Sequence, residues 1–181
     1  MEVRLVASHE LDDRERDAIR SLLDDAFDGR FSDDDWDHTL GGSHALVVGD
    51  AALIAHGALI ERPIEVGGRP RRVGYVEGVA TVPSAQRRGA GSAVMRRLGE
   101  LITERFELGA LSTGAGRFYA RLGWERWEGP TAVRRPDGSI ERTPEDDDGV
   151  MILRTPATVT FAPPLDVTGT IICDHRTGDV W

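Results

Sequence analysis

The sequence contains one cysteine, Cys173, so no disulfide can form within the chain, and a reducing cytoplasm is the expected location. No apolar run approaches the length of a membrane span, and the first residues show no apolar stretch after a basic segment. The five histidines show no metal-ligand spacing with Cys173. We therefore expect a soluble protein without a metal site or a membrane partner, in which Cys173 is structural.

Basic residues are also few relative to acidic ones. The chain has 22 lysines and arginines against 31 aspartates and glutamates, a net charge of −9. This balance argues against a nucleic-acid partner and is compatible with a cationic substrate, although simple solubility explains the same total equally well. With 181 residues, of which 40% are hydrophobic, the sequence predicts a single globular domain over residues 1–181.

The stretch around which the chain is organised covers residues 73–97. β-Branched and aromatic residues predict a strand that stops pairing at Pro83, which has no amide hydrogen. A short loop containing Gly89 and Gly91 follows, and apolar residues from Ser92 onward recur at helical spacing. A glycine loop at a helix N-terminus suits a phosphate or pyrophosphate, because unpaired amides and the positive end of the helix dipole converge there.

This loop, Gln86-Arg87-Arg88-Gly89-Ala90-Gly91, lacks the spacing of a P-loop or a dinucleotide fingerprint. It resembles the acetyl-CoA loop of the Gcn5-related N-acetyltransferase (GNAT) superfamily, including the upstream strand and its Val-Pro pair; the alternative is an ordinary glycine-rich turn. The resemblance implies acetyl-CoA as co-substrate. The implied contacts are Val79, Thr81, Gln86, Arg87, Arg88, Gly89, Gly91 and Ser92, with main-chain amides at residues 79–81 binding pantetheine and the thioester carbonyl.

The order of the remaining elements agrees with that architecture. Strands or helices are expected at residues 3–6, 13–27, 45–48, 51–60, 109–113 and 115–122. Gly49-Asp50 and Gly67-Gly68 are turn signals, and Asp12 with Glu15 has the spacing of a capping box. The predicted fold class is α+β: the GNAT fold, with a mixed, mostly antiparallel central sheet flanked by helices and the acetyl-CoA loop after the fourth strand.

Two residues are candidates for proton transfer. Glu77 is a carboxylate inside an otherwise apolar strand, where it could take the proton of a substrate ammonium; the alternative is a surface-facing strand residue. Tyr119 belongs to the segment Phe118-Tyr119-Ala120-Arg121-Leu122-Gly123-Trp124, which resembles a second GNAT motif. The resemblance implies that its phenol protonates the departing thiolate, and the alternative is a core aromatic.

A closer resemblance extends over nearly the full length. The segments that carry it are residues 36–42, 74–79, 109–112, 119–124 and the last nine residues, Cys173 to Trp181. Together they are similar to the aminoglycoside 2'-N-acetyltransferase family. It implies direct acetyl transfer to the 2'-amine of an aminoglycoside in a ternary complex, resistance to such antibiotics, and a homodimer. It also implies an acidic pocket for a cationic amino sugar, formed by Asp35, Glu77, Ser112, Asp147, Asp179 and the terminal carboxylate of Trp181.

Some positions depart from the family pattern. Arg30 stands where the family is expected to carry an acid, the segment 112–119 is shorter and richer in glycine, and the register of Asp147 is ambiguous within Glu145-Asp146-Asp147-Asp148. Two alternative functions therefore stay open. One is an acetyltransferase for another amine, such as a polyamine or a cell-wall amino sugar, and the other is a non-catalytic acyl-CoA-binding module.

Overall fold

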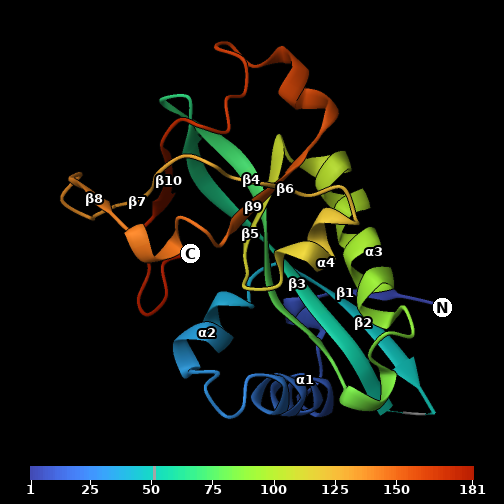
Figure 1. Ribbon diagram of the computed structural model, residues 1–181. Helices are drawn as coiled ribbons and strands as arrows, with labels where there is room; N and C mark the ends of the chain where they lie inside the picture. The colour runs from blue at the N-terminus through green and yellow to red at the C-terminus, as the bar shows by residue number, and fades with distance from the viewer. Residues whose placement is uncertain (51) are drawn as a thin grey trace. The chain divides into compact units, whose positions relative to one another are not determined.

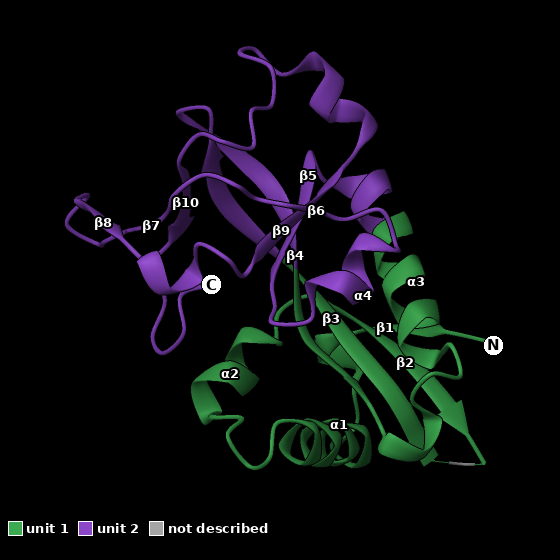
Figure 2. Ribbon diagram, in the orientation of Figure 1, with its two compact units in different colours: residues 1–60, 76–100 green, residues 61–75, 101–181 purple. Residues whose placement is uncertain are grey.

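The computed structural model describes residues 1–50 and 52–181 (Figure 1). Its contacts divide into two compact units (Figure 2): unit 1 comprises residues 1–60 and 76–100, and unit 2 comprises residues 61–75 and 101–181. Two strands and one helix continue from one unit into the other, so the boundaries lie within elements of secondary structure. The single domain expected from the sequence stays a prediction.

Unit 1 begins with a short strand and a helix that the sequence specifies locally. The elements that lie in it are β1 (Arg4–Ala7), η1 (Ser8–Glu10), α1 (Asp13–Ala26), α2 (Asp33–His38), β2 (Ser43–Gly49), η2 (Pro83–Ala85) and parts of β3 (Ala52–Val66), β4 (Arg69–Thr81) and α3 (Ala90–Arg105). The predicted capping box is confirmed, because Asp12 and Glu15 each accept the other's backbone amide hydrogen. The apolar face of α1 then packs into a core with residues of β1, β2 and β4.

The strands of unit 1 pair in sequence order. β1 pairs antiparallel with β2, and β2 pairs antiparallel with β3 through a turn in which Asp50 has a positive φ of 48°. Ala51, where we expected the next strand to begin, lies outside the described residues. The expectation that this strand ends at residue 60 was wrong, because the structure continues it to Val66. Residues 61–66 alternate between more exposed and buried side chains, which is the pattern of a strand covered on one face.

Unit 2 contains the rest of the sheet. Its other elements are β5 (Leu108–Ser112), α4 (Gly116–Ala120), β6 (Glu125–Arg126), β7 (Thr131–Arg134), β8 (Ile140–Arg142), η3 (Pro144–Asp146), β9 (Val150–Arg154), η4 (Pro156–Thr160) and β10 (Ile171–Asp174). The strand order is β6-β9-β5-β4-β3-β10-β7-β8. The β4–β5 and β10–β7 pairs are parallel, whereas β5–β9, β6–β9, β3–β10 and β7–β8 are antiparallel. The predicted mixed, mostly antiparallel sheet is confirmed.

Large aromatic side chains fill the core of unit 2. Tyr75, Trp127 and Trp181 are buried together with Cys173 and the aliphatic residues of β5, β9 and β10. Trp127 satisfies its indole N–H by donating to the carbonyl oxygen of Gly169 at 2.9 Å. Burial raises the pKa of the Cys173 thiol to about 11, so this residue is a core side chain, as expected. Within residues 1–50 and 52–181, every helix is too short or too polar to cross a membrane.

Candidate active site

The loop between β4 and α3 has the geometry of an anion cradle. Arg87 and Gly89 adopt positive φ angles of 59° and 89°, which turn the chain sharply into α3 at Ala90, two residues before the predicted start. The side chains of residues 86–88 are exposed, and a Cβ at Gly89 would meet no heavy atom of the described residues within 4 Å. The first-turn amides of α3 have no intrahelical partner, so the loop fits the pyrophosphate of acetyl-CoA.

Glu77 lies on β4 next to a local irregularity. Gly78 has a φ of 54°, a left-handed conformation that is unusual inside a strand and marks a bulge-like departure from regular pairing. Glu77 and Val79 flank this glycine and are both half-buried. The carbonyl oxygen of Gly78 accepts a hydrogen bond from His56 Nδ1 at 2.7 Å. The structure thus places Glu77 half-buried beside a reoriented peptide, and its role as a general base stays a prediction.

Tyr119 projects from the short helix α4 into an apolar surrounding. Its ring makes edge-to-face contacts with Phe118 and Trp124, at centroid distances of 4.9 Å and 6.3 Å. Burial raises the pKa of Tyr119 to about 12, and a hydrogen bond with the Thr113 side chain offsets part of that increase. The phenol is therefore protonated at neutral pH, which is the state that a proton donor needs.

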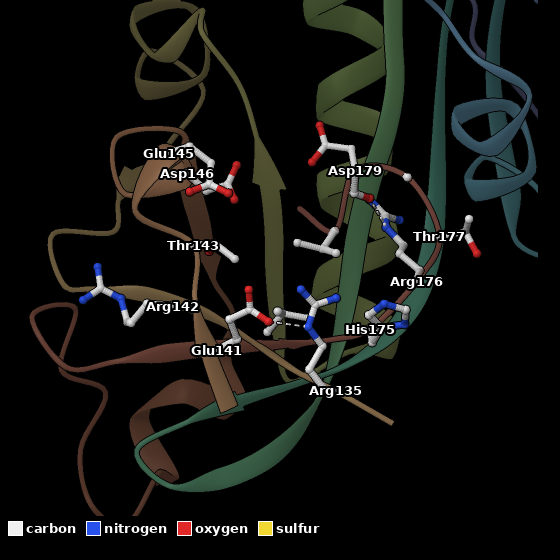
Figure 3. Close-up of a pocket in the computed structure, with 13 residues that line it drawn as sticks. Arg135, Glu141, Arg142, Thr143, Glu145, Asp146, His175, Arg176, Thr177 and Asp179 are labelled. Atoms are coloured by element: carbon white, nitrogen blue, oxygen red, sulfur yellow. Dashed lines mark hydrogen bonds and ion pairs between the residues drawn. The ribbon is translucent and has the colours of Figure 1, made fainter. Parts of the chain in front are cut away.

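Unit 2 contains a polar pocket of about 460 Å³ between η3 and the C-terminal segment, residues 175–181 (Figure 3). Acidic and basic side chains both line it: Glu141, Glu145, Asp146 and Asp179 with Arg135, Arg142, His175 and Arg176. In Figure 3, Asp146 and Asp179 lie on opposite sides of the space. An ammonium group between these two carboxylates would gain charge-assisted hydrogen bonds from both sides.

The Asp146 carboxyl has an unusual environment. It is half-buried on η3, and burial is the main cause that raises its pKa to about 6. The negative charge of Asp179 is the second-largest cause of this increase. A hydrogen bond with the Thr143 side chain lowers the pKa, and the charges of Glu145 and Asp147 raise it further. A bound ammonium would relieve this repulsion and favour the ionised carboxylate.

The neighbouring Asp147 has a different role in the structure. Its Oδ1 accepts hydrogen bonds from the amide and hydroxyl of Thr131 at 2.8 and 2.9 Å, and its Oδ2 accepts one from Arg142 at 2.7 Å. These bonds lower the pKa of Asp147, chiefly through the Thr131 amide. The structure therefore places Asp146 rather than Asp147 among the pocket-lining residues. Sequence alone offered only the four-residue acidic run, in which the register is ambiguous.

The C-terminal segment is held in place by hydrogen bonds that range from exposed to buried. Arg176 Nε donates to the Asp179 carbonyl oxygen at 2.9 Å, and the Trp181 indole donates to Thr143 Oγ1 at 3.1 Å. Arg62 on β3 reaches the same segment, because its guanidinium donates to the carbonyl oxygen of Val180 at 2.9 Å. Arg62 had no sequence signal beyond its charge, since its partners on the C-terminal side lie 112 and 118 positions away in the chain.

The residues that line the pocket do not include the other predicted substrate residues Asp35, Ser112 and Trp181. Asp35 is on α2 and half-buried, and its Oδ2 accepts two hydrogen bonds from the capping residue Ser32. Ser112 is exposed at the end of β5. Trp181 is 4% exposed, and its ring lies in the core of unit 2 rather than among the pocket-lining residues. Arg30 is exposed and folds back onto Asp28 and the carbonyl oxygen of Phe27. The substrate contacts of Asp35, Ser112, Asp147 and Trp181 stay predictions.

Comparison with known proteins identifies the family. The family model described as an acetyltransferase (GNAT) domain matches residues 8–127. A protein of Mycolicibacterium fortuitum named aminoglycoside 2'-N-acetyltransferase is 42% identical over 181 residues, which is 98% of this chain and 91% of that protein.

Two solved structures share the fold. The GNAT-family N-acetyltransferase YhbS of Escherichia coli, solved in complex with CoA, aligns with a TM-score of 0.66 at 16% identity, covering 98% of this chain and 93% of that one. Eis1 of Mycobacterium abscessus aligns with a TM-score of 0.61 at 18% identity, covering 73% of this chain, which spans about a third (34%) of Eis1. With the loop, the sheet order and the relative from M. fortuitum together, the chain belongs to the aminoglycoside 2'-N-acetyltransferase family of the GNAT acetyltransferases.

Proposed function

We propose that this protein transfers an acetyl group from acetyl-CoA to the 2'-amine of aminoglycosides by direct transfer in a ternary complex, and thereby confers resistance. The observation that carries this proposal is the pocket in which Asp146 and Asp179 face each other, in a chain with 42% identity to a protein of that name. Bound acetyl-CoA supplies the acetyl thioester, whose C–S bond breaks as the C–N bond to the amine forms.

The protein's own groups bind and move protons. First-turn amides of α3 and the exposed Arg87 and Arg88 hold the pyrophosphate, and the Val79 amide binds the acetyl carbonyl oxygen. Glu77 accepts the proton of the substrate ammonium, directly or through water, so that the neutral amine attacks. Tyr119, whose pKa is raised to about 12, gives its phenolic proton to the leaving sulfur, and the phenolate takes back the second proton that the nitrogen loses as the amide forms.

The acceptor is held by carboxylates on two segments. Asp146 on η3 and Asp179 on the C-terminal segment bind ammonium groups of the antibiotic. Arg176 lines the same pocket, and the N–H groups of a guanidinium are hydrogen-bond donors, which suits a substrate that carries hydroxyl oxygens besides its amines. This mixture favours an amino sugar over a linear polyamine, which offers no oxygen acceptors.

Two further expectations accompany the proposal. The protein acts in the cytoplasm, where acetyl-CoA is available and the buried thiol of Cys173 stays reduced. It also forms a homodimer, as the resemblance implies. Light scattering after size exclusion at micromolar concentration checks the assembly, and a monomer would overturn it.

The function is tested by thiol release from acetyl-CoA with a panel of amines. The panel contains aminoglycosides that have or lack a 2'-amine, together with spermidine and glucosamine. Turnover confined to compounds with a 2'-amine supports the proposal. Turnover of spermidine or glucosamine alone would favour another amine, and acetyl-CoA binding with no turnover would favour a binding module. A Glu77→Gln variant as active as wild type would remove the assigned base.

A further inference from the structure

A chain of buried hydrogen bonds in unit 1 ends at the strand that carries Glu77. Ser8 Oγ lies 2.9 Å from His44 Nε2, His44 Nδ1 lies 2.9 Å from His56 Nε2, and His56 Nδ1 lies 2.7 Å from the carbonyl oxygen of Gly78. Both imidazoles are 0% exposed, and Ser8 is 7% exposed. The chain joins η1, β2, β3 and β4, four elements that are separate in the sequence.

The direction of every bond follows from the last acceptor. A carbonyl oxygen only accepts, so His56 Nδ1 carries a hydrogen and donates it to Gly78. In a neutral imidazole the other nitrogen is then an acceptor, so His44 donates from Nδ1 to His56 Nε2. By the same argument His44 Nε2 accepts from the Ser8 hydroxyl. The Gly42 carbonyl oxygen also lies 3.1 Å from this hydroxyl, but it already accepts the Ser8 amide hydrogen at 2.9 Å. The Ser8 oxygen in turn accepts the Gly42 amide hydrogen at 3.1 Å. Each polar atom of the chain is satisfied.

Both histidines are neutral at physiological pH. Burial lowers the pKa of His56 to about 3 and that of His44 to about 4, and the charge of Arg16 contributes to the second shift. The guanidinium of Arg16 donates to the backbone carbonyl oxygens of Ser8 and Leu11, so it lies next to Ser8, the first residue of the hydrogen-bond chain. The chain is therefore a fixed set of directed hydrogen bonds and carries no charge of its own.

The point where the chain ends is conformationally special. Gly78 has a φ of 54°, and a Cβ at this position would lie 3.0 Å from Thr39 Cγ2 and 3.4 Å from the Leu23 side chain. Glycine is the residue that tolerates this conformation, and glycine alone also leaves the peptide free to rotate. The bond from His56 removes that freedom, because rotation of the Gly78 peptide would leave a buried imidazole N–H without its acceptor.

We propose that His56, oriented by His44 and Ser8, is a positioning residue that fixes the Gly78 carbonyl and thereby aims the Glu77 side chain and the Val79 amide. The proposal rests on the function proposed above, in which Glu77 is the base and the Val79 amide binds the acetyl carbonyl. A proton relay is excluded by the geometry, because the chain ends on an amide carbonyl oxygen, which does not pass a proton on. A space-filling role alone would be met by an aliphatic side chain without burying two imidazoles.

The first test needs no substitution. Long-range proton–nitrogen correlation spectra of the ¹⁵N-labelled full-length protein at about pH 7 report which imidazole nitrogen carries hydrogen. The Nδ1–H tautomer is expected for both His44 and His56. An Nε2–H tautomer or an imidazolium at His56 would overturn the proposal. This measurement decides the matter even if a variant fails to fold.

The second test compares two substitutions of similar size. His56→Asn places an amide N–H where Nδ1 was and keeps the donor to Gly78, whereas His56→Leu removes it; both lose the bond to His44. We expect the kcat for aminoglycoside acetylation to fall about tenfold or more in His56→Leu and to stay within about threefold in His56→Asn, because small misplacement of catalytic groups is costly. The KM for the aminoglycoside and the loss of Tm are expected to be similar in both.

Equal kcat values in the two folded variants would show a merely structural role and overturn the proposal. If wild type acetylates no aminoglycoside, the proposed function fails separately. The positioning claim is then judged from the backbone amide resonances of Glu77 and Val79. These are expected to shift in His56→Leu and to stay close to wild type in His56→Asn, and unchanged resonances in both would overturn the claim.

Discussion

Arg62 on β3 donates from Nε to Oδ1 of Asp174 on β10 at 2.9 Å, although 112 positions separate the two residues. The same guanidinium also donates to the carbonyl oxygens of Asp174 and Val180, and it stacks on the Tyr75 ring at 4.6 Å. One buried side chain on the sheet thus fixes both ends of the segment that supplies Asp179 to the pocket. The placement of that carboxylate depends on a residue that does not line the pocket.

Replacing Arg62 by Leu should weaken substrate binding through this segment. We expect a loss of about 2 to 3 kcal/mol in the free energy of unfolding, because Asp174 and two carbonyl oxygens lose their donor. The KM for the aminoglycoside should rise about tenfold as Asp179 loses its fixed position, and acetyl-CoA affinity should not change. Urea unfolding and steady-state kinetics measure both effects. Arg72→Leu, which removes an exposed ion pair with Glu61, is the matched control; equal KM values would contradict the role of Arg62.

The acidic run after Pro144 should separate into a binding carboxylate and a structural one. Asp146→Asn should raise the KM for the aminoglycoside about tenfold through loss of a charge-assisted bond. Asp147→Ala should instead lower the free energy of unfolding by about 1 to 2 kcal/mol, because Thr131 and Arg142 lose their acceptor. Asp148→Asn, whose side chain is 88% exposed, is the control for a change of charge in the same loop. A larger effect on KM from Asp147→Ala than from Asp146→Asn would restore the register expected from the sequence.

The affinity for the aminoglycoside should depend on pH through Asp146. Its pKa in the substrate-free protein is raised to about 6, so protonation below that pH removes a negative charge from the pocket. The kcat/KM should therefore fall as pH decreases through about 6. That step should be absent in Asp146→Asn and move to lower pH in Asp179→Asn, since removal of a neighbouring like charge favours ionisation. An identical acid limb in Asp146→Asn and wild type would assign it to another group.

Tyr119→Phe should separate chemistry from binding. Loss of the phenolic proton is expected to lower kcat about 100-fold or more, with the KM for either substrate little changed, because a general acid acts in the transition state. Since the pKa of Tyr119 is raised to about 12, wild-type kcat should show no loss from phenol ionisation up to about pH 10. Rapid quenching and steady-state assays measure these values, and a kcat within threefold of wild type would leave Tyr119 as a core aromatic.

The buried histidines should make the fold sensitive to acid. Their folded pKa values of about 3 and about 4 lie below the ordinary value of 6.5, so the unfolded chain binds more protons below that pH. Stability is then fully present above pH 6.5 and falls as pH decreases, by at most about 1.4 kcal/mol per pH unit for each histidine. Asp146 has the opposite effect on stability, because its folded pKa of about 6 lies above the ordinary value of 3.8. Between these two pH values its protonation stabilises the fold as the pH decreases. Urea unfolding from pH 7 to 4 should show a shallower decline in His56→Asn than in wild type, and equal slopes would contradict neutral burial.

The sequence determined the features that depend on neighbours along the chain. The capping box at Asp12 and the glycine turn at residues 67–68 form as their spacing predicts. The loop after the fourth strand follows from Pro83 and Gly89, because a missing amide ends pairing and glycine permits the positive φ of the sharp turn. These interactions span a few residues, so composition and spacing suffice to predict them.

The tertiary structure decided which side chains meet. Asp146 lines the pocket and Asp147 does not, because Thr131 and Arg142 hold the latter. His56 and Arg62 have no distinguishing local pattern, yet each makes contacts across 12 to 118 positions of sequence. Spacing predicts periodic faces and local turns, but the partner of a buried polar group is set by strand order and register, and these form only when distant segments pack together.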